Sequence, residues 1–187
     1  KALSKKGKIF ISNRTKKPLI ELKKKLSNII REVDLLPWPP PIEKVKEVDI
    51  IINCSSIGFE NFKKDKKGIH SLKFFSPLGN INKNIRVQKS NELLKDYAYK
   101  AAKDISKNVL ETIRFLSKCQ NPMVFDIVYQ PNISYLLYLS DQLGFKTLSG
   151  KMMNLEQAVI AFNKTTSATG LRDSNQDEVR ELMKDVR

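Results

Sequence analysis

Apolar residues along the chain follow two patterns, short continuous runs and helical spacing. The continuous runs predict β-strands at residues 8–12, 33–38, 48–54, 123–129 and 145–148. Apolar positions three and four residues apart predict helices at residues 18–30, 132–143 and 154–162, with a short helical turn within 41–48. Strands and helices therefore alternate, which predicts an α/β domain built on a parallel sheet.

Residues 60–121 interrupt this alternation. They begin with a loop rich in lysine and asparagine and continue into a long helical pattern at residues 90–117, with one apolar stripe. By default such a helix packs on its own domain, and the alternative is an element that binds a partner or mediates dimerisation. After residue 165 the pattern predicts a polar linker and a short charged helix at residues 178–186.

Composition excludes several classes of protein. Hydrophobic residues make up 41% of the chain, which favours a folded globule over a disordered chain. No apolar run approaches the ~20 residues that a membrane-spanning helix needs, so we expect a cytoplasmic protein without membrane contact. Cys54 and Cys119 are too few and too far apart for a disulfide framework or a zinc site, and His70 is the only histidine. We therefore expect no metal site.

The net charge of +14 is concentrated in two segments. Residues 1–25 and residues 61–120 each carry a net charge of +9. A basic surface of this size suits nucleic acid or acidic lipid, whereas lysines that only keep the surface solvated would give the same composition. Aromatic residues are not interleaved with the lysines as a base-stacking surface would require.

The residues that follow the first predicted strand indicate a binding site for a phosphate. Ligands of doubly wound α/β domains bind at the carboxyl ends of the strands. Here the strand is followed by Asn13, Arg14 and Thr15, with Lys17 close behind and no acidic residue before Glu21. An acidic residue would bond a ribose hydroxyl of NAD, whereas a guanidinium can bind the 2′-phosphate of NADP bidentately. The segment thus favours NADP, and an ordinary solvated loop is the alternative.

The loop after the third predicted strand has a second candidate site. In the sequence VDIIINCSSIGF, the residues Asn53, Ser55, Ser56 and Gly58 stand at the end of a continuous apolar run. Small hydroxyl residues and a glycine allow a flat ring to approach the backbone closely. A strand end capped by serines would have a similar sequence.

Four motifs in order make the chain similar to the NADP-binding half of the shikimate dehydrogenase family. They are NRT at residues 13–15, DIIINCSSIG at 49–58, VFDIVYQP at 124–131 and GFKTLSGKMMNLEQAVIAF at 144–162. The resemblance covers residues 1–59 and 122–165. It implies a Rossmann-like parallel sheet that is partial and truncated on its N-terminal side, with residues 60–121 as a basic helical insertion. Residues 166–187 would form a C-terminal linker and helix.

The resemblance also assigns roles to individual residues. Asn13, Arg14, Thr15 and the neighbouring Lys17 would hold the adenosine phosphate, with Arg14 on the 2′-phosphate. The other assigned residues would contact the cofactor along its length, its nicotinamide ring, and the substrate. Asn53, Ser55 and Ser56 would lie along the cofactor, Ile127 and Gly150 beside the nicotinamide, and Tyr129 and Gln157 at hydroxyls of shikimate.

The function implied is NADP-dependent, reversible reduction of 3-dehydroshikimate to shikimate, or the equivalent reaction of a related cyclic polyol. The family's glycine-rich loop and its substrate domain, with the catalytic Lys and Asp, have no counterpart in this sequence. No catalytic residue is therefore assigned, and we expect the chain alone to be inactive unless the missing domain is supplied in cis or in trans. A homodimer is a further arrangement that stays open. The alternative is a non-catalytic Rossmann-like module whose basic insertion binds nucleic acid or a protein partner.

Overall fold

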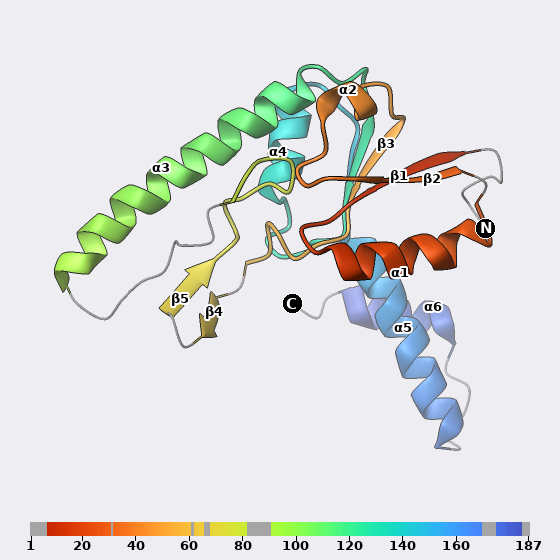
Figure 1. Ribbon diagram of the computed structural model, residues 1–187. Helices are drawn as coiled ribbons and strands as arrows, with labels where there is room; N and C mark the ends of the chain where they lie inside the picture. Colours follow the sequence, from red (N-terminus) through yellow and green to blue (C-terminus); the bar gives the residue numbers. More distant parts are fainter. Residues whose placement is uncertain are drawn as a thin grey trace.

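A computed structural model of the protein describes residues 7–30, 32–60, 62–65, 68–81, 91–169 and 175–184 (Figure 1). Parts of the predicted lysine-rich loop, the first residue of the helix predicted at 90–117 and parts of the predicted C-terminal segment lie outside these residues. No helix within the described ranges is both long and apolar enough to cross a membrane.

The first part of the chain forms a β–α–β unit. Strand β1 (Lys8–Ser12) pairs in parallel with β2 (Glu32–Leu36), and helix α1 (Lys16–Ser27) connects them. Both strands are short and contain three apolar residues each, and α1 contacts β2. Pro18 stands in the first turn of α1, where its missing N–H costs no helical hydrogen bond. The predicted strands and helix are confirmed, with α1 beginning two residues earlier than expected.

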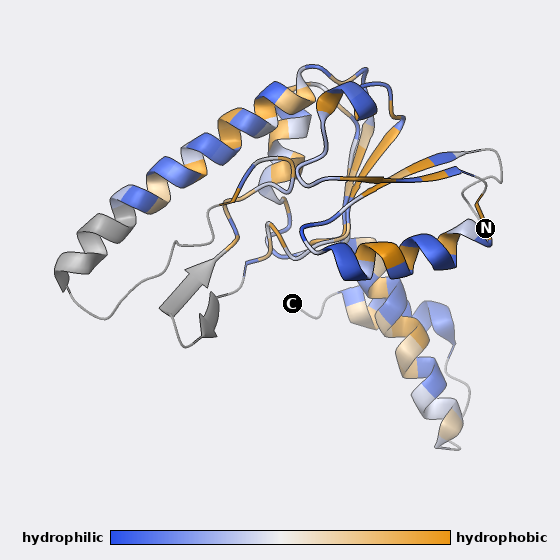
Figure 2. Cartoon of the chain, viewed as in Figure 1, coloured by the Kyte–Doolittle hydropathy of each residue, from blue (hydrophilic) through white to orange (hydrophobic). Residues whose placement is uncertain are grey.

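Three further strands form a second parallel sheet. Its order is β3 (Ile50–Asn53), β6 (Met123–Asp126) and β7 (Thr147–Ser149). Along the chain, the short helix α2 (Ile42–Val45) precedes β3. Helix α3 (Asn91–Leu116) connects to β6, and α4 (Tyr135–Gln142) follows β6 and precedes β7. The predicted α/β architecture with a parallel sheet is therefore confirmed. Figure 2 shows the strands of both sheets as mostly hydrophobic.

The hydrophobic core lies between the sheet and helices α3 and α4. Its buried members come from α2, α3, β6, α4 and the segment before α3. They are Val45, Leu78, Phe115, Leu116, Val124, Leu136, Leu137 and Leu139. Phe10 of β1 and Leu36 of β2 pack against this cluster. Both sheets therefore share one core, although no hydrogen bond between described residues joins them into one sheet.

The second half of α3 belongs to this core. Asn108 and Thr112 are fully buried together with Leu116. The Asn108 side chain donates to the carbonyls of Ser76 and Asn80, at 3.0 and 3.1 Å, and accepts from the Ser76 N–H at 2.8 Å. The segment before α3 is thus fastened to the helix. Helix packing on its own domain, the default expectation for this element, holds for its second half.

Two further predictions differ from the structure. The strand predicted at residues 123–129 ends at Asp126, because the Asp126 side chain takes the Val128 N–H that a longer strand would give to its neighbour. The loop predicted at the start of the 60–121 segment contains an antiparallel hairpin, β4 (Phe62–Asp65) with β5 (Gly68–Ser71). Its polar sequence lacks the alternation that signals a strand.

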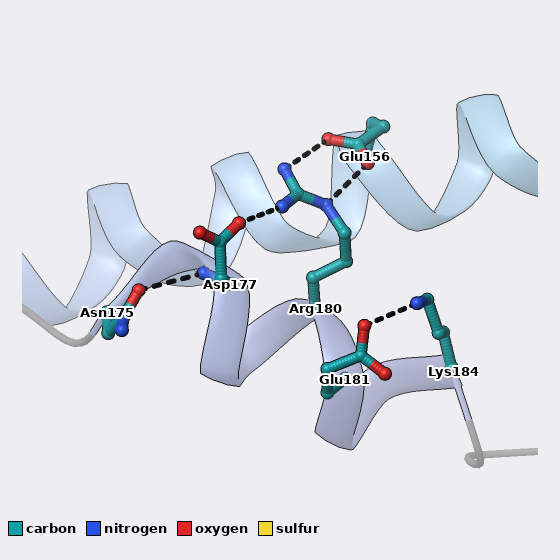
Figure 3. A network of polar contacts seen from close by, with 6 residues as sticks. All are labelled: Glu156, Asn175, Asp177, Arg180, Glu181 and Lys184. Atoms are coloured by element: carbon teal, nitrogen blue, oxygen red, sulfur yellow. Dashed lines mark hydrogen bonds and ion pairs between the residues drawn. The ribbon is translucent and has the colours of Figure 1, made fainter.

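The last two helices pack on each other. Helix α5 (Lys151–Ala168) is longer than the helix predicted at 154–162, and α6 (Gln176–Lys184) contacts it. Arg180 of α6 joins both carboxylate oxygens of Glu156, at 2.7 and 3.1 Å, and also pairs with Asp177 (Figure 3). The guanidinium lowers the pKa of Glu156. This bidentate pair fixes the orientation of α6 against α5.

Candidate functional site

The candidate site residues follow the carboxyl ends of the parallel strands. Residues 13–15 follow β1, Asn53 ends β3, Ile127 and Tyr129 follow β6, and Gly150 follows β7. Because all these strands are parallel to their neighbours, these residues lie along the carboxyl edges of the two sheets. This is the edge at which open α/β folds bind ligands.

A buried carboxylate organises the middle of this edge. Asp126 is fully buried, and its Oδ1 accepts hydrogen bonds from Asn53 Nδ2 and the Val128 N–H, both at 2.9 Å. Its Oδ2 accepts from the Ser134 hydroxyl at 2.5 Å, and that hydroxyl also caps α4 by accepting from the Leu137 N–H. One side chain therefore ties the ends of β3 and β6 to the start of α4.

Burial and hydrogen bonding act on this carboxyl in opposite directions. Desolvation raises the pKa of Asp126 above its usual range, and it outweighs the bonds from Ser134, Val128 and Asn53 that favour the ionised form. Burial raises the pKa of the neighbouring Cys54 thiol, and the negative charge of Asp126 raises it further. The middle of the edge is thus suited to hold loops in place and holds no activated nucleophile among these residues.

Two of the predicted cofactor contacts use their side chains within the protein. Asn53 is buried; its amide also donates to the Ile57 carbonyl at 3.0 Å, and its Oδ1 accepts from the N–H and the hydroxyl of Ser55. The Ser55 oxygen in turn accepts from the Ile57 N–H. Ser56 is exposed. The loop thereby holds its shape through Asn53 and Ser55, and Ser56 is its exposed hydroxyl.

Gly58 closes the same loop by its backbone. Its φ of +96° is a conformation that side chains with a Cβ rarely adopt, and its N–H donates to the Leu72 carbonyl at 3.0 Å. A Cβ at this position would lie 3.4 Å from that of Ser134. The glycine therefore serves this turn through its conformation.

Gly150 and Ile127, both predicted beside the nicotinamide, are brought into direct backbone contact. A Cβ at residue 150 would lie 2.2 Å from the Ile127 carbonyl oxygen and 2.5 Å from its carbonyl carbon. The Ile127 N–H donates to the Asn53 carbonyl at 3.1 Å, so the loops after β3, β6 and β7 converge here. Glycine at 150 is required by this close approach.

Arg14 stands at the other end of the edge, in a different environment. Its guanidinium carbon lies 5.5 Å from the centroid of the Trp38 ring, which follows β2. The indole N–H donates to the Pro77 carbonyl at 3.0 Å and fixes the ring. Arg14 is exposed, so the ring orients the guanidinium while its N–H groups stay accessible.

The start of α1 adds to the positive charge at this end. Thr15 is the N-cap residue, yet its side chain forms no capping bond, and the first turn holds Lys16 and Lys17 without any acidic residue. A helix N-terminus presents free N–H groups and a positive dipole end. Asn13, Thr15 and Lys17 are all exposed, so the predicted phosphate site is an open cationic surface.

The two predicted substrate contacts lie on the loop after β6 and on α5. Tyr129 is half-buried, and its ring meets Phe59 edge to face with centroids 5.7 Å apart. Gln157 is exposed in the second turn of α5, the helix that Gly150 begins.

Sequence reasoning missed two residues of this edge. Trp38 follows a short strand and precedes three prolines, and nothing local connects it with Arg14. Asp126 interrupts an otherwise apolar run, and that interruption is the signal that could have marked it as a buried, bonded carboxylate.

Comparison with known proteins gives a fold and no sequence family. No protein-family model and no curated protein matches the sequence. Among solved structures, the chain is similar to shikimate 5-dehydrogenase from Listeria monocytogenes in complex with shikimate and NAD, with a TM-score of 0.57 and 17% identity. It is also similar to a shikimate dehydrogenase in complex with NADP+, with a TM-score of 0.52 and 21% identity.

These similarities cover 95% and 97% of this chain and 47% of each solved chain. The chain therefore spans just under half the length of the structures that it matches. The Rossmann-like fold expected from the four motifs is confirmed, and the chain has the fold of part of a shikimate dehydrogenase.

Proposed function

We propose that this chain is the NADP-binding part of an oxidoreductase that resembles shikimate dehydrogenase. Its substrate would be shikimate or a related cyclic polyol, interconverted with the 3-dehydro compound. The two solved structures named above contain NAD or NADP+, and this chain corresponds to 47% of each of them. Their ligands support a nicotinamide dinucleotide as the class of cofactor. The substrate domain and the catalytic acid–base pair would come from another segment, in cis or in trans, and the chain alone would not turn over substrate.

The observation that carries the choice of NADP is the cationic end of the edge. Arg14 is oriented by Trp38 and stands immediately before a helix whose first turn contains Lys16 and Lys17. A bidentate guanidinium and a helix N-terminus both favour a dianionic phosphate. NAD has only a ribose hydroxyl there, and no carboxylate in the first turn of α1 is available to bond it.

The loops at the other end fit the nicotinamide half of such a cofactor. The backbones of Ile127 and Gly150 meet without intervening side chains, so a flat ring could lie against them. When bound, NADP would supply the hydride, and the residues of this chain would position it. Tyr129 and Gln157 would contribute hydroxyl-binding contacts to the substrate.

The experiment is a titration with NADP+ and with NAD+, read by the fluorescence of Trp38. This is the only tryptophan of the chain, and it touches the guanidinium under test. We expect NADP+ to change the emission, and we expect Arg14→Ala to weaken NADP+ binding by at least about tenfold through loss of charge-assisted bonds. Binding of NAD+ should be unchanged.

The matched control is Lys24→Ala, which removes one positive charge from the last turn of the same helix. It should leave the preference between the two cofactors intact. Equal affinity for NADP+ and NAD+ in the unaltered chain, or an Arg14→Ala variant that still prefers NADP+, would contradict the assignment.

Nucleic-acid binding is the second candidate, and one feature of α3 favours it. Lys100, Lys103 and Lys107 are exposed at helical spacing on a segment with a net charge of +9. If this face binds single-stranded RNA, the affinity will fall steeply with salt and will drop when the three lysines become glutamine. Binding that survives this triple substitution would exclude α3 as the interface.

A further inference from the structure

Residues 72–80 contact the carboxyl edge at two places. The Leu72 carbonyl accepts the Gly58 N–H at 3.0 Å, and this bond closes the loop after β3. The Pro77 carbonyl accepts the Trp38 indole N–H, also at 3.0 Å, and Trp38 follows β2. The 72–80 segment comes before α3, so a part of the chain outside the alternation of parallel strands and helices is in contact with the candidate site.

Asn108 of α3 holds the 72–80 segment in place. Its amide nitrogen donates to the carbonyls of Ser76 and Asn80, and its Oδ1 accepts from the Ser76 N–H at 2.8 Å. Asn108 and Ser76 are fully buried, so a substitution that removes the amide leaves the backbone groups of Ser76 without water to replace it. The bonded residues precede and follow Pro77 in the chain, so the segment is held on both sides of that residue.

Gly79 brings the backbone of the segment directly against α3. A Cβ at residue 79 would lie 2.5 Å from the Asn108 carbonyl oxygen and 2.6 Å from its Nδ2. The Leu78 N–H also donates to the Ser76 hydroxyl at 3.2 Å, which closes a turn around Pro77. Proline restricts φ within this turn. The Pro77 carbonyl is therefore held in one direction.

The direction of this carbonyl decides the orientation of the Trp38 ring. The indole N–H is the one hydrogen-bonding group of a tryptophan side chain, and here it donates to Pro77. The guanidinium carbon of Arg14 lies 5.5 Å from the centroid of the ring, and the arginine side chain is exposed. A long exposed side chain loses rotamer freedom when it binds a ligand, and a contact that already orders it reduces this cost. A fixed ring thus favours phosphate binding by Arg14.

We propose that Asn108 is a positioning residue for Arg14 and thereby contributes to the preference for NADP. It acts through the backbone of residues 76–80 and through the Trp38 ring, without touching the cofactor itself. The inference rests on the proposed function, since it names a residue that sets the specificity of the same site. It also gives α3 a role in that site, in addition to the contribution of its second half to the core.

The test compares the unaltered chain with Asn108→Leu, which keeps a side chain of similar size but removes all three bonds to the segment. The first readout is the anisotropy decay of Trp38 fluorescence without cofactor, and we expect the variant to gain a fast component because its ring is no longer fixed. The second readout is the ratio of the affinities for NADP+ and NAD+. We expect this ratio to fall by about three- to tenfold, the cost of ordering one long side chain on binding. A merely structural role would weaken both cofactors equally and leave the ratio unchanged.

Two further variants keep this test decisive. Pro77→Gly leaves the buried bonds of Asn108 intact but frees the backbone of the turn, so it replaces Asn108→Leu if that variant fails to fold. It should change both readouts in the same direction. Ser140→Ala is the matched control, because Ser140 is also fully buried and its hydroxyl donates to the Leu136 carbonyl at 2.8 Å within α4. It should leave both readouts as they are in the unaltered chain.

A preference for NADP+ that survives in Asn108→Leu and Pro77→Gly would overturn the inference, as would a ratio that falls equally in Ser140→Ala. A Trp38 ring that stays fixed in the first two variants would also overturn it. Equal affinity of the unaltered chain for NADP+ and NAD+ would contradict the proposed function, and the inference with it. The anisotropy measurement needs no cofactor, so failure of the hydrogen-bonded connection is distinguishable from failure of the cofactor assignment.

Discussion

The carboxyl edge uses charged groups in opposite ways at its buried middle, around Asp126, and at its exposed end, around Arg14. Asp126 is fully buried and takes three hydrogen bonds from its own chain, whereas Arg14 is exposed and lies over the face of Trp38. Both belong to motifs quoted above, NRT and VFDIVYQP, yet of the two only Arg14 has donors accessible to a ligand. A motif residue at this edge can therefore serve the fold or the ligand, and its existing hydrogen bonds distinguish the two.

The largest expected effect is on stability at the buried middle of the edge. Asp126→Ala leaves Asn53 Nδ2, the Val128 N–H and the Ser134 hydroxyl without their acceptor, and we expect it to lower the free energy of unfolding by about 3 kcal/mol. Urea denaturation followed by circular dichroism measures this. Asp141→Ala, at an exposed position of α4, is the control and should have little effect. Equal losses in both variants would show that the network contributes nothing specific.

Gly150 gives the next effect, through backbone contact. Gly150→Ala puts a Cβ against the Ile127 carbonyl, and because both partners are backbone the loops must separate, at a cost of about 2 kcal/mol. Gly144→Ala is the comparison, since its Cβ would meet nothing within 4 Å and only its φ of +80° is strained. We expect about 1 kcal/mol there. A smaller loss at residue 150 than at residue 144 would contradict the close approach.

The pH dependence of stability follows from the raised pKa of Asp126. The folded state holds this proton more tightly than the unfolded state does, whose carboxyl titrates near 3.8. The contribution of Asp126 is therefore fully present below that value and is lost as pH rises through the folded-state pKa. Relative to Asp126→Asn, which does not titrate, the unaltered chain should lose free energy of unfolding over this range. If the unaltered chain instead gained free energy of unfolding relative to Asp126→Asn as pH rises, the direction of the shift would be contradicted.

Local sequence patterns sufficed for most of the elements and for the position of Arg14 directly after the first strand. The apolar runs predicted the parallel strands, and the helical spacings predicted α1 and α4 and the position of α3, because such elements bury one regular face. The strand predicted through residue 129 was wrong beyond Asp126, since a side chain competed for the Val128 N–H. Trp38 could not be connected with Arg14 because their contact joins the ends of two strands and depends on the tertiary fold.

The smallest expected effect on stability is at the exposed end, and it completes the comparison. Arg14→Ala removes a cation over the Trp38 ring at an exposed site, and we expect the free energy of unfolding to change by no more than about 0.5 kcal/mol. The same urea titration measures it. The variant that weakens NADP+ binding should thus remain as stable as the unaltered chain. A loss comparable with that of Asp126→Ala would make Arg14 part of the fold, and its effect on cofactor affinity would then no longer indicate a contact with the 2′-phosphate.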